Sequence, residues 1–184
     1  MTERAYSRIY QVSDFVHGFC EDGHTFIPNS ARQLLATTHT AKVPKKISRT
    51  EAKALGLKAA DLFSPVPQPK TFSHYVMNLP STAIDFVPDF IGLYAGHEAL
   101  FAPHTETKLP MVHCYCFAPK HEDGDPEMLV PKGIICKELS ERLGFEMDIG
   151  MEDLSIWDVR DVAPNKRQYC ASFRIPAEVA YRKR

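Results

Sequence analysis

A short polar crest at the end of an apolar run is the best candidate for chemistry in this chain. Residues 73–80 read Ser-His-Tyr-Val-Met-Asn-Leu-Pro, so the run ends at Asn78 and a turn follows at Pro80. An amphipathic pattern begins at Ser81, which predicts a strand, a turn and the start of a helix. In open α/β sheets, ligands bind just outside the carboxyl ends of the strands, where Asn78 would stand. Its amide has both donors and an acceptor, which suits the edge of a nucleobase.

Histidines and cysteines offer a metal site as an alternative chemistry. The candidate ligands are His104, His113, Cys114, Cys116 and Cys136. On a strand, Cys114 and Cys116 would share one face while His113 points to the other. The sequence has no paired Cys-x-x-Cys units of the kind that build structural zinc sites. Because free cysteine is often a core residue, the pattern favours buried, reduced thiols over a metal site.

The composition is that of an ordinary globular domain. The chain has 184 residues, enough for one domain with a sizeable core, and a formal net charge of −1. A net charge near zero creates no global field toward nucleic acid, so any RNA contact must come from local patches. Five cysteines without framework spacing favour reduced thiols and an intracellular compartment. No apolar run is long enough to cross a bilayer, and residues 1–5 lack the apolar core of a secretory signal.

Hydrophobic periodicity predicts an alternation of strands and helices. Helical spacing recurs in three segments, 25–35, 81–94 and 131–143. Strand patterns recur in five segments, 14–20, 74–77, 109–117, 156–162 and 168–175. Pro88 is expected to kink or end the second helix, and the acidic segment 121–127 is expected to be a loop. The short connector between the last two strands indicates an antiparallel hairpin that ends an α/β sheet.

Residues 36–70 differ in composition from the rest of the chain. Their basic residues are Lys42, Lys45, Lys46, Arg49, Lys53, Lys58 and Lys70, against only Glu51 and Asp61. Ser48, with Glu51 three residues later, predicts a short capped helix within 48–57. The remainder is expected to be a mobile basic insertion. Either an electrostatic contact to RNA phosphates or a solvated loop between two core elements would explain its charge.

Three stretches together resemble one protein family. They are 76–80 with 83–86 (VMNLP and AIDF), 109–117 (LPMVHCYCF) and 159–166 (VRDVAPNK). In this order and spacing they are similar to the C-terminal half of the archaeal and eukaryotic tRNA (guanine-N1)-methyltransferases that modify position 37. Residues 19–27 (FCEDGHTFI) resemble the same family's turn after its third strand. The resemblance covers most of the chain and excludes 36–70 and a diverged start.

The resemblance implies roles for residues at three places in the chain. In the family, the residues that match Asp22 and Gly23 help to hold the adenosine part of S-adenosylmethionine. Those that match Asn78 and Pro80 lie by the methyl donor and the target guanine in the anticodon loop of tRNA. A segment near the catalytic face matches Arg160, Asn165 and Lys166.

Structural roles remain open for several of these residues. Asp22 and Gly23 would otherwise form a simple turn. Arg160 would otherwise pair with Asp158 or Asp161 and close the sheet. No metal and no membrane contact is implied by the family. Its members are usually monomeric and act in the cytoplasm, the nucleus or the mitochondrial matrix.

Segments that the family carries upstream have no counterpart in this sequence. They are an RNA-binding domain, a segment with the proposed general base, a Gly-rich cofactor loop and an acidic residue for the ribose. The resemblance therefore implies that residues 1–184 are the C-terminal part of the catalytic domain, with a flexible insertion at 36–70. This would be an incomplete class I, Rossmann-like α/β methyltransferase domain, which lacks the first two strands.

Such a chain would have an incomplete sheet. The strand 14–20 would lose its neighbours and the strand 74–77 would become an exposed edge, so we expect poor stability and a tendency to self-associate. A non-catalytic fragment or interaction module that needs the missing half is the alternative to an enzyme.

Overall fold

The computed structural model describes residues 15–120 and 127–183, which form two compact units. The hairpin unit comprises the described residues up to Asp22 together with Arg32–Lys70. The sheet unit comprises Gly23–Ala31 and the described residues from Thr71 onward. None of the described helices is both long and apolar enough to cross a lipid bilayer.

The sheet unit contains a four-stranded mixed sheet. Its strands are β3 (His74–Met77), β4 (Met111–Pro119), β5 (Leu154–Ala163) and β6 (Lys166–Arg174), in the spatial order β3-β4-β6-β5. β3 runs parallel to β4, whereas β6 is antiparallel to both β4 and β5. The expected hairpin at the end of the sheet is confirmed, and β3 lies at the other edge among the strands that the structure describes.

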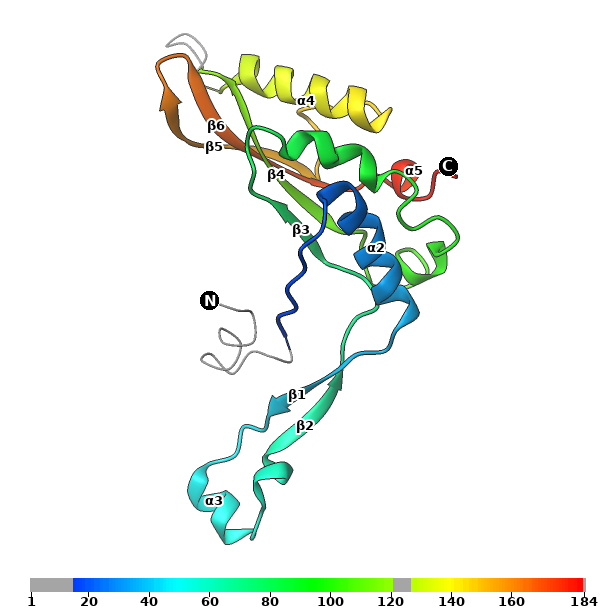
Figure 1. Ribbon diagram of the computed structural model, residues 1–184, viewed down its shortest axis with the longest axis vertical. Helices are drawn as coiled ribbons and strands as arrows, with labels where there is room; N and C mark the ends of the chain where they lie inside the picture. Colours follow the sequence, from blue (N-terminus) through cyan, green and yellow to red (C-terminus); the bar gives the residue numbers. More distant parts are fainter. Residues whose placement is uncertain (1–14, 121–126, 184) are drawn as a thin grey trace. The chain divides into compact units, whose positions relative to one another are not determined.

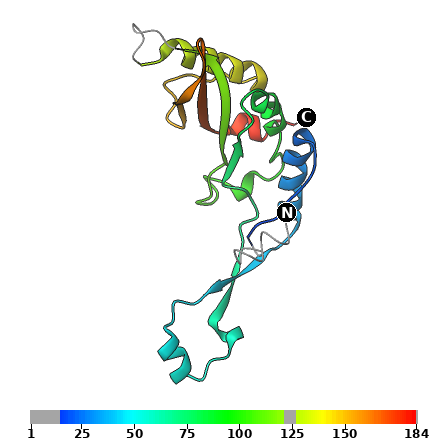
Figure 2. The ribbon, with the colours of Figure 1, turned by 60° about the vertical axis from the view of Figure 1, so that its left-hand side comes forward.

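Helices cover one face of this sheet (Figures 1 and 2). The main ones are α4 (Leu129–Leu143) and the 3₁₀ helix η2 (Ala83–Phe90), which contact each other and β4. Alternate residues of β4 turn toward them and are buried, as the apolar alternation of a strand on a core requires. We call this the covered face, and define it by Val112, Cys114, Ala171 and Phe173, which are all fully buried. Here the core of the unit lies.

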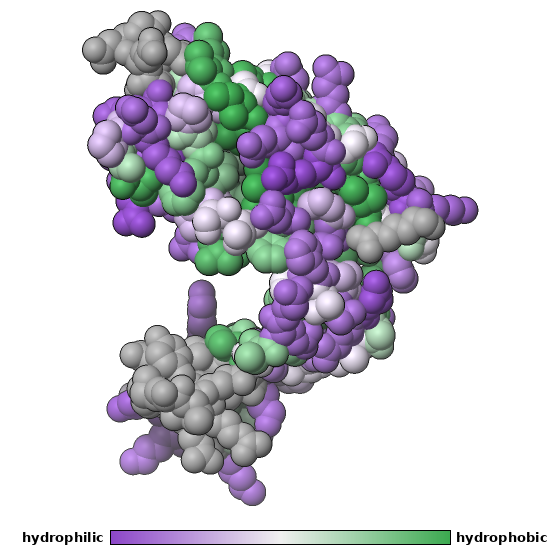
Figure 3. All heavy atoms as spheres, turned by 45° about the horizontal axis from the view of Figure 1, so that its top comes forward, coloured by the Kyte–Doolittle hydropathy of each residue, from purple (hydrophilic) through white to green (hydrophobic). Residues whose placement is uncertain are grey.

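The opposite side of the sheet is less protected. Val76 on β3 and Trp157 on β5 each keep 67% of their surface exposed, and His113 and Tyr115 on β4 are half-buried. We call this the open face and define it by these four residues. Apolar side chains reach the surface in patches among hydrophilic ones on the side drawn in Figure 3. A parallel strand pair such as β3–β4 is normally covered on both faces, so the open face is unusual.

Shorter elements complete the sheet unit. They are the start of α2 (Gly23–Ala36), η3 (Glu98–Leu100) and α5 (Ala177–Ala180). Because α2 begins two residues earlier than expected, Pro28 lies inside it rather than in its first turn. The segment after Pro80 forms a 3₁₀ helix that ends two residues after Pro88, in agreement with the expected early stop.

One expected strand is absent. Among residues 15–20, the described part of the predicted strand 14–20, no residue has strand structure, and Asp14 lies outside the described residues. The physical reason is that a strand needs a neighbour for its backbone hydrogen bonds, and β1–β6 pair only with one another. The predicted acidic loop 121–127 lies outside the described residues except for Glu127.

The hairpin unit is built on a two-stranded antiparallel ladder. β1 (Thr40–Pro44) pairs with β2 (Phe63–Pro67), and the connection between them holds α3 (Arg49–Ala54) and η1 (Ala59–Leu62). The predicted cap of the short helix is confirmed, because the Ser48 hydroxyl accepts a hydrogen bond from the Glu51 backbone N–H at 3.1 Å. The segment 36–70 thus has regular structure, while its flexibility stays a prediction.

Candidate functional site

The crest that follows β3 is exposed and well supported. Asn78 directly follows the last residue of β3, and Pro80 is half-buried in the turn before η2. The backbone N–H groups of Thr82 and Ala83 both donate to the Leu79 carbonyl, at 2.9 and 2.7 Å, which fixes the turn. The Asn78 amide has no hydrogen bond to any residue that the structure describes, so its donors and acceptor can serve a ligand.

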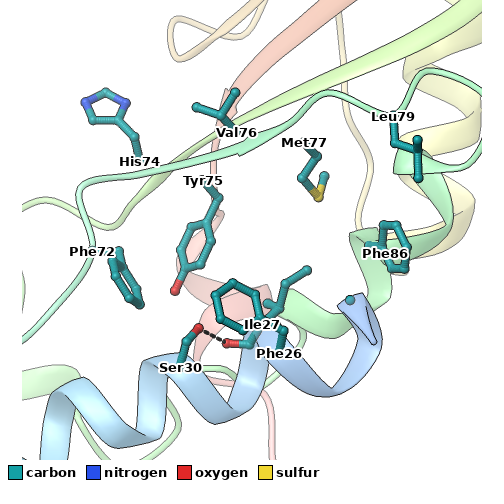
Figure 4. A pocket seen from close by; sticks show the side chains of 11 residues that line it. Phe26, Ile27, Ser30, Phe72, His74, Tyr75, Val76, Met77, Leu79 and Phe86 are labelled. Carbon is teal, nitrogen blue, oxygen red and sulfur yellow. Dashed lines mark hydrogen bonds between the residues drawn. The ribbon is translucent and has the colours of Figure 1, made fainter. Parts of the chain in front are cut away.

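A pocket of about 330 Å³ opens beside this crest (Figure 4). Tyr75 and Met77 of β3 point into it, while His74 and Val76 point to the other side of the strand. The pocket is lined by Gly23, Phe26, Ile27, Ser30, Phe72, His74, Tyr75, Val76, Met77, Leu79 and Phe86. Met77 and Leu79, the neighbours of Asn78 in the chain, both line this apolar, aromatic pocket, whereas Asn78 itself is not among the lining residues.

The glycine at the start of α2 is required by packing. A Cβ atom on Gly23 would lie 2.8 Å from Cε1 of the Phe86 ring, closer than van der Waals contact allows. The next residue, His24, packs its ring 4.7 Å from that of Phe86, and its Nδ1 lies 2.8 Å from Oδ2 of Asp89. The helix start is therefore held against η2. Gly23 has a structural reason for its identity that does not depend on a cofactor.

The residue before this glycine is accessible to solvent. Asp22 is exposed and immediately precedes α2, the position where Asp is favoured because its carboxylate can cap the helix. Asp22 and Gly23 thus lead into a helix rather than form a separate turn. The role of Asp22 in binding the cofactor stays a prediction.

The hairpin formed by β5 and β6 carries the third group of predicted site residues. Arg160 does not pair with Asp158 or Asp161; its Nε donates instead to Gln168 Oε1 at 2.9 Å. Arg167 forms the ion pairs with both aspartates. The reason is an irregularity in the ladder between Asp158 and Arg160, which sets Arg160 opposite Gln168.

The tip of this hairpin is exposed. Asn165 lies in the turn, and the Lys166 ammonium stands 4.1 Å from the centre of the Phe117 ring, within cation–π distance. Met77 pairs with Cys114 on β4, whereas Lys166 pairs with Pro119, five residues farther along. At roughly 3.4 Å per residue, Lys166 lies about 17 Å beyond the end of β3. The sheet brings Asn78 and Lys166 to the same end but not into contact.

A row of polar side chains crosses the open face and was not predicted. His74 Nδ1 and His113 Nε2 share a hydrogen bond of 2.9 Å, and His113 Nδ1 lies 2.8 Å from the Ser172 hydroxyl. Burial lowers the pKa of His113, and the neighbouring His74 lowers it further. Strand alternation alone could not identify this row. Whether His74 and His113 meet depends on the register between β3 and β4, in which Val76, and not His74, is the residue opposite His113.

Cys114 and Cys116 of β4 are buried, and their thiols are protonated. Burial, the largest cause, raises the pKa of the Cys116 thiol to about 12 and raises that of Cys114 as well. Both thiols lie on the covered face and His113 on the other, as strand alternation predicted. Among residues 15–120 and 127–183, no group of three or more His, Cys, Asp or Glu side chains is placed to hold one ion.

Comparison with known proteins identifies relatives of one name. The chain is 44% identical over 188 residues to a protein of Phaeosphaeria nodorum named tRNA (guanine(37)-N(1))-methyltransferase; the match covers 95% of this chain and 40% of that protein. Proteins of the same name from Neurospora crassa and Schizosaccharomyces pombe are 42% and 33% identical over 188 and 174 residues. These matches cover 95% and 94% of this chain, and 36% and 37% of the relatives.

Two further comparisons gave no match. No family model matches the chain, and no solved structure matches it. The chain spans about two fifths of the length of the curated relatives that it matches. Over nearly its whole length, the chain is thus a homologue of part of the tRNA (guanine(37)-N(1))-methyltransferases.

Proposed function

We propose that this chain is the C-terminal part of the catalytic domain of a tRNA methyltransferase that acts on N1 of guanosine 37. The observation that carries the proposal is the Asn-Leu-Pro crest, which follows the carboxyl end of a parallel strand and contributes Leu79 to the lining of an apolar pocket. Ligands of open α/β sheets bind at this edge. The name shared by the relatives supports methyl transfer to a tRNA guanosine as the reaction.

The role of Asn78 in this reaction is to position the base. The target guanine has to leave its stack and be held by hydrogen bonds to its edge. The exposed Asn78 amide can donate and accept such bonds, and the Leu79 carbonyl contacts hold it in place. N1 carries a proton at neutral pH, which a positioned base has to remove. An amide cannot take that proton, so the base must come from another group.

The pocket fits part of the expected cofactor. Its lining is almost entirely apolar, with the Ser30 hydroxyl already bonded to the Ile27 carbonyl at 3.1 Å. Such a surface suits a flat adenine ring, which Phe26, Met77 and Phe86 would contact. It offers no charged group for the amino-acid end of S-adenosylmethionine. When bound, that cofactor supplies the methyl group.

We further propose that the free edge of β3 and the open face are contacts for the rest of a class I methyltransferase domain. A strand added beside β3 would satisfy the backbone groups at its outer edge, which pair with none of the described strands. A helical layer on the other side would cover Val76 and Trp157, which are two-thirds exposed. The relatives are long enough to supply both, because about three fifths of their length is not matched by this chain.

The second candidate function is a non-catalytic interaction module. The open face favours it, since exposed large apolar side chains such as Val76 and Trp157 are typical of protein–protein interaction sites. The two candidates differ in what that partner is: the remainder of an enzyme, or another protein.

Calorimetric titration with S-adenosylmethionine tests the proposal. The chain is titrated alone and after co-expression with the unmatched part of the Phaeosphaeria nodorum relative. Micromolar binding by the chain alone would show that it builds a cofactor pocket unaided. Binding only in the complex, with methylation of a G37 transcript, would show that it is half of an enzyme. A stable complex that neither binds the cofactor nor methylates tRNA would overturn the proposal and favour the interaction module.

A further inference from the structure

A net positive charge is concentrated in residues 36–70 of the hairpin unit of this protein. Residues 36–70 carry seven basic and two acidic side chains, a net charge of +5, whereas the whole chain has a net charge of −1. All seven are exposed: Lys42, Lys45, Lys46, Arg49, Lys53, Lys58 and Lys70. The remaining residues therefore sum to −6, so the near-neutral total conceals two oppositely charged parts. A local field of this kind attracts a polyanion.

The two acidic side chains of this segment serve its helices. Glu51 lies in the first turn of α3, where a negative charge is favourable at the helix N-terminus. Asp61 accepts a hydrogen bond from the Lys58 backbone N–H at 2.8 Å and so caps η1. Lys45, Lys46 and Lys53 form no ion pair with any residue that the structure describes. The charges of these three lysines are thus left for an external partner.

The backbone that carries these charges forms a two-stranded ladder that is closed to strand addition. The β1–β2 ladder is extended by a hydrogen bond from Lys45 N–H to the Leu62 carbonyl at 2.8 Å. Pro44, Pro65 and Pro67 lie within the two strands, and proline cannot donate to a further strand. The hairpin is therefore poorly suited to bind a peptide by β-sheet augmentation.

The arrangement of the charges favours a phosphate backbone over a membrane. Arg49 and Lys53 are four residues apart on α3, so they share one face of the helix. Helices that bind membranes need a large apolar face next to their basic one. α3 has six residues, and its only apolar ones are alanines. It can offer charge but no membrane anchor.

We propose that residues 42–58 of the hairpin unit bind backbone phosphates of the tRNA. This inference rests on the proposed function for the identity of the RNA, and adds a contact outside the crest and pocket. Such contacts position an RNA without reading its sequence, and their strength falls steeply with salt. The hairpin would raise affinity for every tRNA alike, while the crest discriminates the target base.

A matched pair of triple variants tests the proposal. The hairpin variant is Lys45→Gln/Lys46→Gln/Lys53→Gln, and the control variant is Lys108→Gln/Lys137→Gln/Lys183→Gln, in which three equally exposed lysines of the sheet unit are neutralised. Both lose the same charge. Fluorescence anisotropy measures the binding of each full chain to two unmodified tRNA transcripts, with G37 or A37, between about 50 and 200 mM salt.

The hairpin variant should bind both transcripts at least about tenfold more weakly than the original chain. The slope of log affinity against log salt should become shallower by about two to three, because three lysines are lost and each lost phosphate contact removes about 0.7 to 0.9 units. The control variant should change neither quantity by more than about twofold. Equal losses in the two variants, an unchanged slope, or no binding of the original chain at low salt would overturn the proposal.

Further arms separate this proposal from the function on which it rests. Weakened binding by the hairpin variant, with no methylation of G37 by the completed protein, would support the hairpin contact and contradict the proposed function. If the completed protein methylates G37 and the hairpin variant has the same KM for tRNA, the proposed function would be supported and the hairpin contact contradicted. A further outcome is that the original chain binds phosphatidylserine vesicles in a salt-dependent way. If the hairpin variant loses that binding and its tRNA binding is unchanged, the partner of the hairpin would be a membrane surface and not RNA.

Discussion

The two faces of the sheet in this protein differ in how completely they are covered. On the covered face, Val112, Cys114 and Phe173 have no exposed surface. On the open face, Val76 and Trp157 keep two-thirds of theirs. The same four strands carry both faces, but alternate residues face opposite ways, and the open face also carries the polar row of His74, His113 and Ser172. One face is packed as a core, and the other leaves large apolar side chains exposed.

The largest difference in stability between the two faces is expected when one large side chain on each is truncated to alanine. Phe173→Ala on the covered face should lower the free energy of unfolding by about 3–5 kcal/mol, because it leaves a cavity in a packed core. Trp157→Ala on the open face should change it by less than about 0.5 kcal/mol, as for other exposed sites. Urea denaturation of both variants measures the two effects. Similar losses would mean that Trp157 is already packed in the isolated chain, for example by self-association.

The crest should matter for activity rather than for stability. In the completed enzyme, Asn78→Ala should lower turnover by roughly a hundredfold, because positioning of the reacting groups is lost. Its urea midpoint should not change, because the Asn78 side chain is exposed. Turnover is measured with saturating tRNA, and Ser81→Ala, a change at a nearby exposed residue, is the control. Normal turnover of the asparagine variant would remove Asn78 from the site.

The start of α2 offers a test of packing on the covered side. Gly23→Ala should destabilise the chain by about 1–3 kcal/mol, because the new methyl group meets the Phe86 ring at 2.8 Å. A double variant with Phe86→Leu should recover part of the loss. Urea denaturation measures both. If Gly23→Ala instead abolishes cofactor binding without a change in stability, the glycine serves the ligand and not the helix contact.

The open face should respond to pH through a smaller effect. The pKa of His113 is lowered in the folded chain by burial and by His74, so the folded state binds its proton less readily than the unfolded state. This group therefore destabilises the fold as pH falls from about 6.5, the ordinary value of histidine, through its lowered pKa. The urea midpoint at pH 5 relative to pH 7 should fall less in His113→Gln than in the original chain. His104→Gln, which removes an exposed histidine, should leave that difference as it is.

The pattern of the sequence predicted most of the strands and helices of the sheet unit. The density of apolar residues in 109–117 and the helical spacing of 131–143 depend on local periodicity, and β4 and α4 follow them closely. The predicted strand 14–20 is not formed in its described part, residues 15–20, because a strand forms only beside a neighbour and local pattern cannot supply one. The partner of Arg160 was also wrong, because an irregularity in the ladder changed which residue stands opposite it.

The sequence by itself determined the crest residues, the cysteine positions and the charge of residues 36–70, since these depend on residue type and spacing alone. Only the tertiary structure decided that Gly23 has to accommodate the Phe86 ring and that His74, His113 and Ser172 form a row. It also decided which face of the sheet is open. These features require contacts between segments distant in the chain, and such contacts depend on register and packing that no single stretch of sequence encodes.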